Sequence, residues 1–275
     1  MVQDLRGKWV LLTGAAGGIG REVCLLLANE GCSMVIADID ADALFAFERE
    51  LIALGAKTLA KVMDVTDKGQ VQALADEVEA RIGTVDILIN NAGIGYNNDL
   101  RHTTGEDWQR LMNINFFGVL NVTYAFLPGM IKKGGGQIVN ISTGQVFFPV
   151  PTWGAYAASK AALATFSEAL TWELALFKIR VTTVYPGLIS TPFYKDVHAS
   201  TMPQRLVLWY INTLGSSPQV MALKIVSGIK KRKRRVIQSA LNWFTYLGKR
   251  SAPMGFDIGG DLFAQALCDR RKSER

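Results

Sequence analysis

The chain has few of the residues from which proteins build disulfide frameworks and metal centres. Its 275 residues include three cysteines, Cys24, Cys32 and Cys268, without C-x-x-C spacing, and two histidines, His102 and His198, without ligand-like spacing. These counts argue against a disulfide framework and a zinc site, so we expect no bound metal and a reducing compartment, the cytoplasm. We interpret both histidines as surface residues.

Long apolar runs are also missing. No stretch reaches the roughly 18 consecutive apolar residues that a membrane span requires. Residues 1–7 are short and polar, which is unlike a secretory signal peptide. Apolar residues still make up 49% of the chain, so we expect a substantial core. Neither an internal repeat nor a linker divides the sequence, which favours a single domain.

Acidic residues become scarce towards the C-terminus. Residues 224–275 hold 13 Lys/Arg and 4 Asp/Glu, whereas residues 1–223 hold 17 and 20. The basic run 230–235 precedes a predicted helix with one apolar face (Ala240, Leu241, Trp243, Phe244, Leu247) and one polar face (Gln238, Asn242, Thr245). This combination favours peripheral contact of residues 230–250 with anionic membranes. The alternative is a solvated charge run followed by a helix packed on the domain. We predict no nucleic-acid partner, because nothing else resembles a reader of bases.

Short apolar runs alternate with helical patterns along the chain. The predicted strands cover residues 8–12, 33–38, 57–63, 85–89, 137–141, 179–184 and 236–237. Predicted helices include 42–54, 68–82, 105–132 and 156–177. Strict alternation predicts an α/β fold: a single Rossmann-like, doubly wound domain with a parallel sheet of about seven strands and helices on both faces. Ligands of such sheets bind beyond the carboxyl ends of the strands.

A glycine-rich turn joins the first predicted strand to the first helix. It reads Thr13-Gly14-Ala15-Ala16-Gly17-Gly18-Ile19-Gly20, a T-G-x-x-x-G-x-G spacing. Glycines let the backbone turn tightly and let a pyrophosphate approach the helix N-terminus. Asp38 ends the second strand roughly 20 residues later, where a carboxylate accepts hydrogen bonds from a ribose diol and repels a 2′-phosphate. No basic residue follows it, so the sequence favours NAD over NADP.

Seven ordered motifs resemble those of the classical short-chain dehydrogenases/reductases, over about residues 5–192. They are Thr13-Gly14…Gly18-Ile19-Gly20, Asp64-Val65, Asn90-Asn91-Ala92-Gly93, Asn113–Gly118, Ile141-Ser142-Thr143, Tyr156…Lys160 and Pro186-Gly187…Thr191. The resemblance implies an oxidoreductase with Asn115, Thr143, Tyr156 and Lys160 as catalytic residues. It also implies NAD contacts at Gly14, Gly18, Ile19, Gly20, Asp38, Ile39, Asp64, Val65, Asn91, Ala92, Gly93, Tyr156, Lys160, Pro186, Gly187, Ile189 and Thr191.

The chemistry of the tyrosine and lysine agrees with this resemblance. A free tyrosine, with a pKa of about 10, is too weakly acidic to act as a base near neutral pH. A lysine ammonium one helical turn away favours the phenolate, and Lys160 has that spacing from Tyr156. One position departs from the family, whose serine 13 residues before the tyrosine is Thr143 here. We expect the Thr143 hydroxyl to orient the substrate. The alternative is a bulge that brings Ser142 inward.

The remaining expectations concern domains, substrate and partners. We expect one NAD-binding domain over residues 1–275, with a core at about 5–192, a substrate lid at about 193–215 and a C-terminal extension at about 224–275. Aromatic and apolar residues in the lid region, with Phe147, Phe148 and Trp153, predict a lipophilic alcohol or ketone of a steroid-, retinoid- or acyl-like kind. They are equally compatible with core or dimer contacts. The tail is most similar to hydroxysteroid-dehydrogenase-like members, and the resemblance implies a homodimer or homotetramer. The rival function is a non-catalytic NAD-binding or membrane-interacting protein of the same fold.

Overall fold

The computed structural model describes residues 2–190, 209, 215–251 and 254. Its centre is a seven-stranded, all-parallel sheet with the strand order β3-β2-β1-β4-β5-β6-β7. The strands are β1 (Trp9–Thr13), β2 (Ser33–Asp38), β3 (Thr58–Val62), β4 (Ile87–Asn90), β5 (Gly136–Ile141), β6 (Ile179–Tyr185) and β7 (Arg235–Ile237). The predicted α/β class, strand number and parallel arrangement are therefore confirmed.

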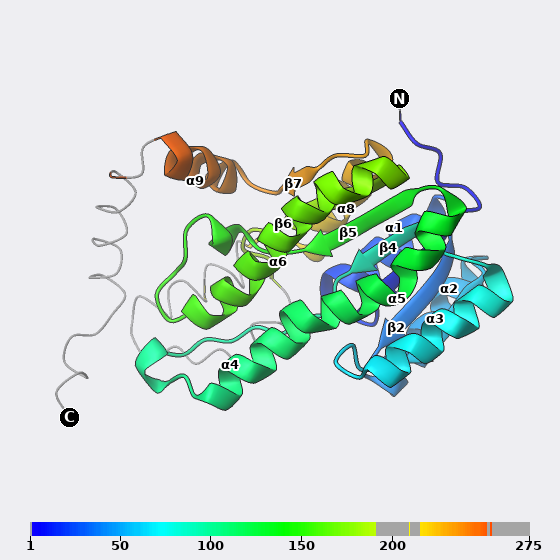
Figure 1. The fold of residues 1–275 in the computed structure, drawn as a ribbon, viewed down its shortest axis with the longest axis horizontal. Helices are drawn as coiled ribbons and strands as arrows, with labels where there is room; N and C mark the ends of the chain where they lie inside the picture. Colours follow the sequence, from blue (N-terminus) through cyan, green and yellow to red (C-terminus); the bar gives the residue numbers. More distant parts are fainter. Residues whose placement is uncertain (1, 191–208, 210–214, 252–253, 255–275) are drawn as a thin grey trace.

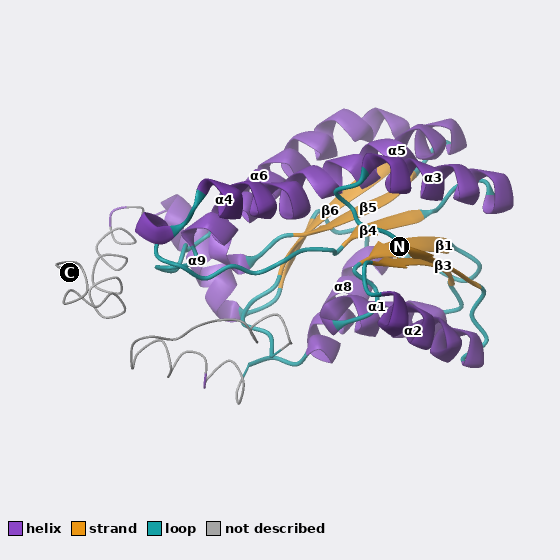
Figure 2. Cartoon of the chain, turned by 90° about the horizontal axis from the view of Figure 1, so that it is seen from below, coloured by secondary structure: helices purple, strands orange, loops and turns teal. Residues whose placement is uncertain are grey.

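Helices cover both faces of this sheet, as Figure 2 shows. One layer holds α1 (Gly18–Asn29), α2 (Ala41–Ala53) and α8 (Pro218–Lys230), and the other holds α3 (Lys68–Ile82), α5 (Gly118–Lys133) and α6 (Gly154–Glu173). Successive strand residues point to opposite faces, so Val10 and Leu12 pack under one layer and Leu11 under the other. Burial on both faces explains why the strands are almost continuously apolar.

The predicted long helix at 105–132 is interrupted in the structure. It consists of α4 (Gly105–Met112), a π-helical turn η2 (Asn113–Phe117) and α5. The stretch Gly105–Lys133 is long and apolar enough to cross a membrane. Its inner residues Val122, Phe126 and Met130 nevertheless belong to the core between α5 and the sheet, so it forms part of the covering layer.

Two further helical predictions are refined. The helix that carries Tyr156 ends at Glu173, four residues earlier than predicted, and continues as a 3-10 turn η4 (Leu174–Phe177). Short 3-10 turns η1 (Leu100–His102) and η3 (Gly144–Val146) lie in the loops after β4 and β5. The C-terminal helix α9 (Ala240–Ser251) follows β7.

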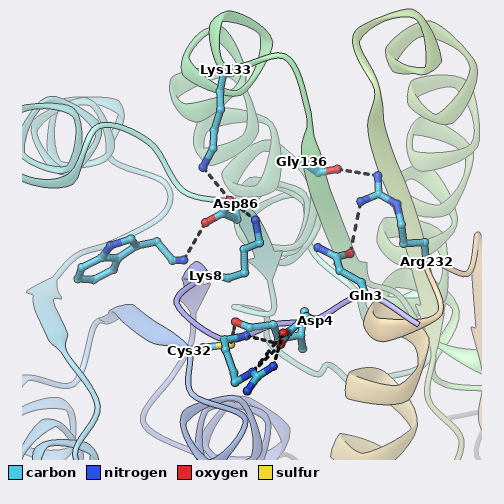
Figure 3. A network of polar contacts seen from close by, with 11 residues as sticks. Gln3, Asp4, Lys8, Cys32, Asp86, Lys133, Gly136 and Arg232 are labelled. Atoms are coloured by element: carbon cyan, nitrogen blue, oxygen red, sulfur yellow. Dashed lines mark hydrogen bonds and ion pairs between the residues drawn. The ribbon is translucent and has the colours of Figure 1, made fainter. Parts of the chain in front are cut away.

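Polar side chains tie together the amino ends of the strands, far from the predicted site (Figure 3). Asp86 accepts hydrogen bonds from the amines of Lys8 (3.2 Å) and Lys133 (2.7 Å). Arg232 donates to Gly136 O at 3.3 Å and to the Gln3 side chain at 3.4 Å. These contacts connect the N-terminal segment, β4, β5 and the segment before β7 at the amino edge of the sheet.

Several basic side chains of the run 230–235 are engaged in contacts within the domain. Lys230 pairs with Glu30 at 2.8 Å, and Arg235 pairs with Glu168 at 2.6 Å. Arg232 donates to Gly136 O and to the Gln3 side chain, as described above. Most of the run precedes β7, whereas α9 begins beyond its carboxyl end (Figure 1). The guanidinium of Arg235 lies over the Tyr246 ring of α9, 5.9 Å from its centroid, so the last residue of the run contacts the helix.

Candidate active site

The direction of strand order reverses between β1 and β4, which creates a crevice at the carboxyl edge of the sheet. After β1 the chain moves outwards to β2 and β3, then returns to form β4 on the other side of β1. In open α/β sheets this switch point is where ligands bind. Among the described residues, those predicted to bind and react follow the carboxyl ends of β1 to β6 or lie on η2 or α6.

The glycine-rich turn leaves the start of α1 open to a ligand. Gly14 and Gly18 have φ of +67° and +54°, which favour glycine. A Cβ on Gly14 would lie 2.9 Å from Ala92 Cα, and one on Gly20 would lie 2.6 Å from Asn91 Nδ2. Gly17 caps α1 without a side-chain hydrogen bond, and the space beside its Cα is empty. The first N–H groups of α1 therefore form a cradle for an anion. Ile19 packs on the core behind this cradle.

Asp38 closes the far side of the glycine turn. Its Oδ2 accepts from Ala16 N at 2.8 Å, and its Oδ1 accepts from Asp40 N at 3.1 Å. Asp40 caps α2 by accepting from Ala43 N at 3.0 Å. The neighbouring Ile39 is exposed. Asp38 thus presents a carboxylate beside the anion cradle.

Asn91 connects the loops after β1 and β4. Its side-chain amide donates to Thr13 O (3.1 Å) and Gly14 O (2.8 Å). Asp64 Oδ1 accepts from Thr66 N at 2.8 Å and shapes the turn after β3. The next residue, Val65, is buried against Gly118. These contacts fix the walls of the crevice on the side of Asp38.

Tyr156 and Lys160 lie in the first half of α6, both nearly buried at 6% and 4% exposure. The ring of Tyr156 meets that of Trp153 edge-on, with centroids 5.7 Å apart. The Lys160 amine donates to Ile141 O at 3.2 Å, at the end of β5. Burial lowers the pKa of Lys160 to about 8, because the charged amine loses its hydration.

Asn115 lies in the π-helical turn and is fully buried. Its Oδ1 accepts from Ile94 N at 2.9 Å, and its Nδ2 donates to Ile94 O (3.0 Å) and to Ser159 Oγ (3.1 Å). A Cβ built on Gly93 would lie 2.9 Å from both Asn115 Oδ1 and Lys160 Nζ. The missing side chain at Gly93 therefore lets these two polar groups converge.

The two neighbouring hydroxyls after β5 have different surroundings. Ser142 is 2% exposed, and its Oγ donates to Lys160 O at 2.9 Å. Thr143 is 7% exposed, and its Oγ1 accepts from Gln145 N at 3.4 Å. The Ser142 proton is thus engaged by the backbone of α6, while the Thr143 hydroxyl uses only its acceptor side in these contacts.

Comparison with known proteins agrees with this geometry. Residues 8–201 match the family described as short chain dehydrogenase. The chain belongs to the short-chain dehydrogenase family. The putative oxidoreductase SadH of Mycobacterium tuberculosis is 36% identical over 248 residues, covering 86% of this chain and 87% of its own. The chain is thus related to an oxidoreductase along most of its length.

Two solved structures of this family superpose on the chain. A 7α-hydroxysteroid dehydrogenase complexed with NADH and 7-oxo glycochenodeoxycholic acid is 30% identical, with a TM-score of 0.76 over 85% of this chain and 94% of its own. L-Sorbose reductase from Gluconobacter frateurii, complexed with NADPH and L-sorbose, is 27% identical, with a TM-score of 0.76 over 86% and 97%.

In this short-chain dehydrogenase, the loop after β6 is held by residues that sequence reasoning did not select. Gly187 N donates to the side-chain oxygen of Gln238 at 2.7 Å. Ile189 is buried at 3% exposure and forms an isolated parallel β-bridge with Ser216. Pro186 precedes this pair, and Thr191 lies outside the described residues. The sequence offered little indication that Gln238 contacts this loop, because its pattern placed Gln238 on the polar face of the predicted C-terminal helix.

Part of the predicted apolar pocket belongs to the core instead. Phe147 packs on Tyr185 and Tyr246, with centroids 4.7 and 5.1 Å away. Trp209 is exposed. The other predicted lid residues, Phe193, Tyr194, Leu206, Leu208 and Tyr210, lie outside the described residues, as do His198 and Cys268. Within the described part of the short-chain dehydrogenase, no three His, Cys, Asp or Glu side chains cluster as a metal site.

Proposed function

We propose that this short-chain dehydrogenase interconverts a secondary alcohol and a ketone on a lipophilic substrate, using NAD. The observation that carries the proposal is that the part of α6 with Tyr156 and Lys160 is bonded to the end of β5, from Lys160 to Ile141 O and from Ser142 to Lys160 O, directly before Thr143. The uncapped N-terminus of α1 lies at the same edge of the sheet. A reactive phenol, a buried amine and a hydroxyl are the groups that proton transfer to a carbonyl oxygen requires.

The glycine cradle fits a dinucleotide. A pyrophosphate there would accept from the uncapped N–H groups of α1, and Gly14 and Gly20 leave no side chain in its path. Asp38 would accept from the adenosine ribose, with Ile39, Asp64, Val65, Asn91, Ala92 and Gly93 along that half of the cofactor. Ile189 and Thr191 would hold the carboxamide. Once bound, the nicotinamide accepts or donates the hydride.

The side chains of the site would divide the proton chemistry among them. Tyr156 would take the alcohol proton or return it to the ketone oxygen, and Thr143 would donate a hydrogen bond to that oxygen. Lys160 has donors left beyond its bond to Ile141 O, so it would stabilise the phenolate and hold the nicotinamide ribose. Asn115 would support proton exchange behind Lys160, because both groups face the space beside Gly93.

A preference for NAD is supported by two features of the adenosine side. The Asp38 carboxylate faces the position of a 2′-phosphate and would repel it. Arg21, the basic residue next to the glycine turn, pairs with Glu50 and lies over the Phe47 ring at 5.2 Å. This arrangement directs the guanidinium towards α2, which leaves it poorly placed to neutralise a phosphate.

The lipophilic substrate is supported by one aromatic side chain beside Tyr156 and by the likeness to a steroid-converting enzyme. Trp153 lies against Tyr156 and is 8% exposed. The 7α-hydroxysteroid dehydrogenase, at 30% identity, was solved with a bile-acid ketone. A steroid-, retinoid- or acyl-like alcohol is the substrate class that we infer, with residues 193–215 as its lid in a single domain.

A homo-oligomer is part of the proposal. The outer faces of α5 and α6 carry an aromatic patch in which Phe166 contacts Phe116 and Tyr124 edge-on. Tyr124 and Trp172 are 56% and 63% exposed. Such a patch is typical of a surface that a second copy covers.

The last part of the proposal concerns membrane contact through α9, whose outer face is apolar. Leu241, Phe244 and Leu247 are 64%, 68% and 55% exposed, and the last turn carries Lys249 and Arg250. This face would make reversible contact with anionic lipid, independently of residues 230–235. Co-sedimentation with phosphatidylserine vesicles tests it. Loss of binding in Phe244→Ser is expected, and unchanged binding would refute the contact.

The central experiment is a steady-state assay with NAD and a panel of hydrophobic secondary alcohols. We expect turnover by the wild type, and none by Tyr156→Phe at unchanged NADH binding, because the substitution removes only the hydroxyl. Equal turnover in Tyr156→Phe would refute the mechanism. NADH binding without turnover on any substrate would favour the rival, non-catalytic function.

A further inference from the structure

The loops after β5 and β6 meet the beginning of α9 through buried polar side chains. Gln238, just before α9, and Asn242, in its first turn, are 6% and 8% exposed, although both were assigned to the polar face of the predicted helix. The apolar residues of α9 point outwards instead. This inverted helix needs an explanation, because burying polar groups is unfavourable unless they form hydrogen bonds.

Gln238 bonds to the end of β6 and to the loop after it through both its side chain and its backbone. Its side-chain oxygen accepts from Gly187 N at 2.7 Å, and its backbone N donates to Tyr185 O at 3.3 Å. Its own carbonyl accepts from the Lys224 amine of α8. Gln238 is therefore fixed, and it provides the hydrogen-bond acceptor for Gly187 N.

Asn242 fills the space between the loops after β5 and β6. Its side-chain amide donates to Tyr185 O at 3.4 Å, and its backbone N donates to Ser239 Oγ at 3.0 Å. A Cβ on Gly144 would lie 2.6 Å from its Cγ, so Asn242 packs directly on the Gly144 backbone. Gly144 N in turn donates to Pro186 O at 2.8 Å.

We infer that Gln238 and Asn242 are positioning residues for the active site. Gln238 holds Gly187, two residues before Ile189, which is proposed to hold the carboxamide, so Gln238 acts on binding of the nicotinamide end. Asn242 supports Gly144, the neighbour of Thr143, so it acts on the orientation of the substrate oxygen. The inference rests on the proposed function and assigns an active-site role to the C-terminal extension.

The test for Gln238 compares three variants by NADH fluorescence titration and by kinetics. Gln238→Met keeps the length but removes the acceptor, so NADH affinity should fall roughly 10-fold, the equivalent of one lost hydrogen bond. Gln238→Glu keeps an acceptor for Gly187 N and should restore most of that affinity. Thr245→Ala is the matched control, because Thr245 bonds only to the Asn242 carbonyl of its own helix. It should bind NADH like the wild type.

Asn242→Ala supplies the second measurement. It should lower kcat roughly 10-fold and reduce NADH affinity less than Gln238→Met does, because Asn242 packs on Gly144 beside Thr143, while its long bond to Tyr185 O lies before the cofactor loop. The positioning roles would be refuted if Gln238→Met bound NADH like the wild type and Asn242→Ala kept the wild-type kcat. That result would leave the proposed function standing. Wild-type protein that neither binds NADH nor turns over a substrate would overturn the proposed function as well.

Discussion

The contrast between Ser142 and Thr143 offers a sharp test of the site. Both are hydroxyls at the end of β5, and the family pattern places its serine at the position of Thr143. Ser142 Oγ donates to Lys160 O at 2.9 Å, whereas Thr143 Oγ1 accepts a long bond from Gln145 N. We therefore expect Thr143 to affect catalysis and Ser142 to affect stability.

The two effects differ in size and in kind. Thr143→Val keeps the volume but removes the donor, so kcat should fall roughly 10²–10³-fold, as for one lost oxyanion donor, about 2.7–4 kcal/mol. Ser142→Ala removes one buried hydrogen bond, worth about 1 kcal/mol of unfolding free energy. For a chain of this size that lowers Tm by roughly 2–4 °C, while kcat should change little, since the lost bond contributes to folding rather than to the transition state.

The assay measures kcat and Tm for both variants and for Thr143→Ser, which retains the hydroxyl and should keep or raise activity. The reasoning fails if Ser142→Ala loses activity and Thr143→Val does not. That outcome would mean that the backbone turns by one residue when substrate binds, and that Ser142 faces the substrate.

Four shorter predictions complete the set. Because a charged amine donates more strongly than a neutral one, NAD affinity should fall as pH rises through about 8, the lowered pKa of Lys160. Isothermal titration at several pH values checks this, and Lys160→Ala should flatten the curve. Asp38→Ala should raise kcat/KM for NADP relative to NAD by roughly 10-fold, about 1.4 kcal/mol. Gly93→Ala should slow turnover by displacing Lys160, with Tm as the control. Tyr124→Glu with Trp172→Glu should yield monomers in ultracentrifugation, whereas a wild type that is already monomeric would contradict the oligomer.

The crevice between β1 and β4 was predictable because its signals are local in sequence. Glycine spacing determines the turn before α1, and Asp38 and Asn91 each follow a buried apolar run directly. Parallel strands bring such positions to one edge whatever the loops do. The structure accordingly joins Asn91 to the glycine turn and Asp38 to Ala16 N.

The interruption at Asn113–Phe117 was not predictable from helical periodicity, which continues through it. A π-helical turn leaves the apolar stripe almost intact but turns Asn115 inwards, where it bonds to the Ile94 backbone. The presence of an asparagine in an apolar helix was the available signal. Its role in satisfying backbone groups follows only from the neighbouring loop.

The sequence left the orientation of α9 open between an apolar face towards lipid and a helix packed on the domain, and the structure shows Leu241, Phe244 and Leu247 exposed. An amphipathic helix normally buries its apolar face, but the end of a parallel sheet presents N–H and C=O groups that no further strand pairs. Gly187 N and Tyr185 O are such groups, and Gln238 and Asn242 satisfy them. Leaving such groups buried and unpaired would cost about 1–3 kcal/mol each.

The same reasoning explains how the site is built as a whole. Several buried or partly buried polar side chains at the carboxyl edge bond to backbone atoms of neighbouring segments: Asn91 to Gly14, Asn115 to Ile94, Ser142 to Lys160 and Gln238 to Gly187. These residues make the loops rigid, because each bond joins segments that are distant in sequence or lie on different elements. Rigid loops keep the proposed reacting groups in place without further contacts to one another, which leaves their remaining donors for cofactor and substrate.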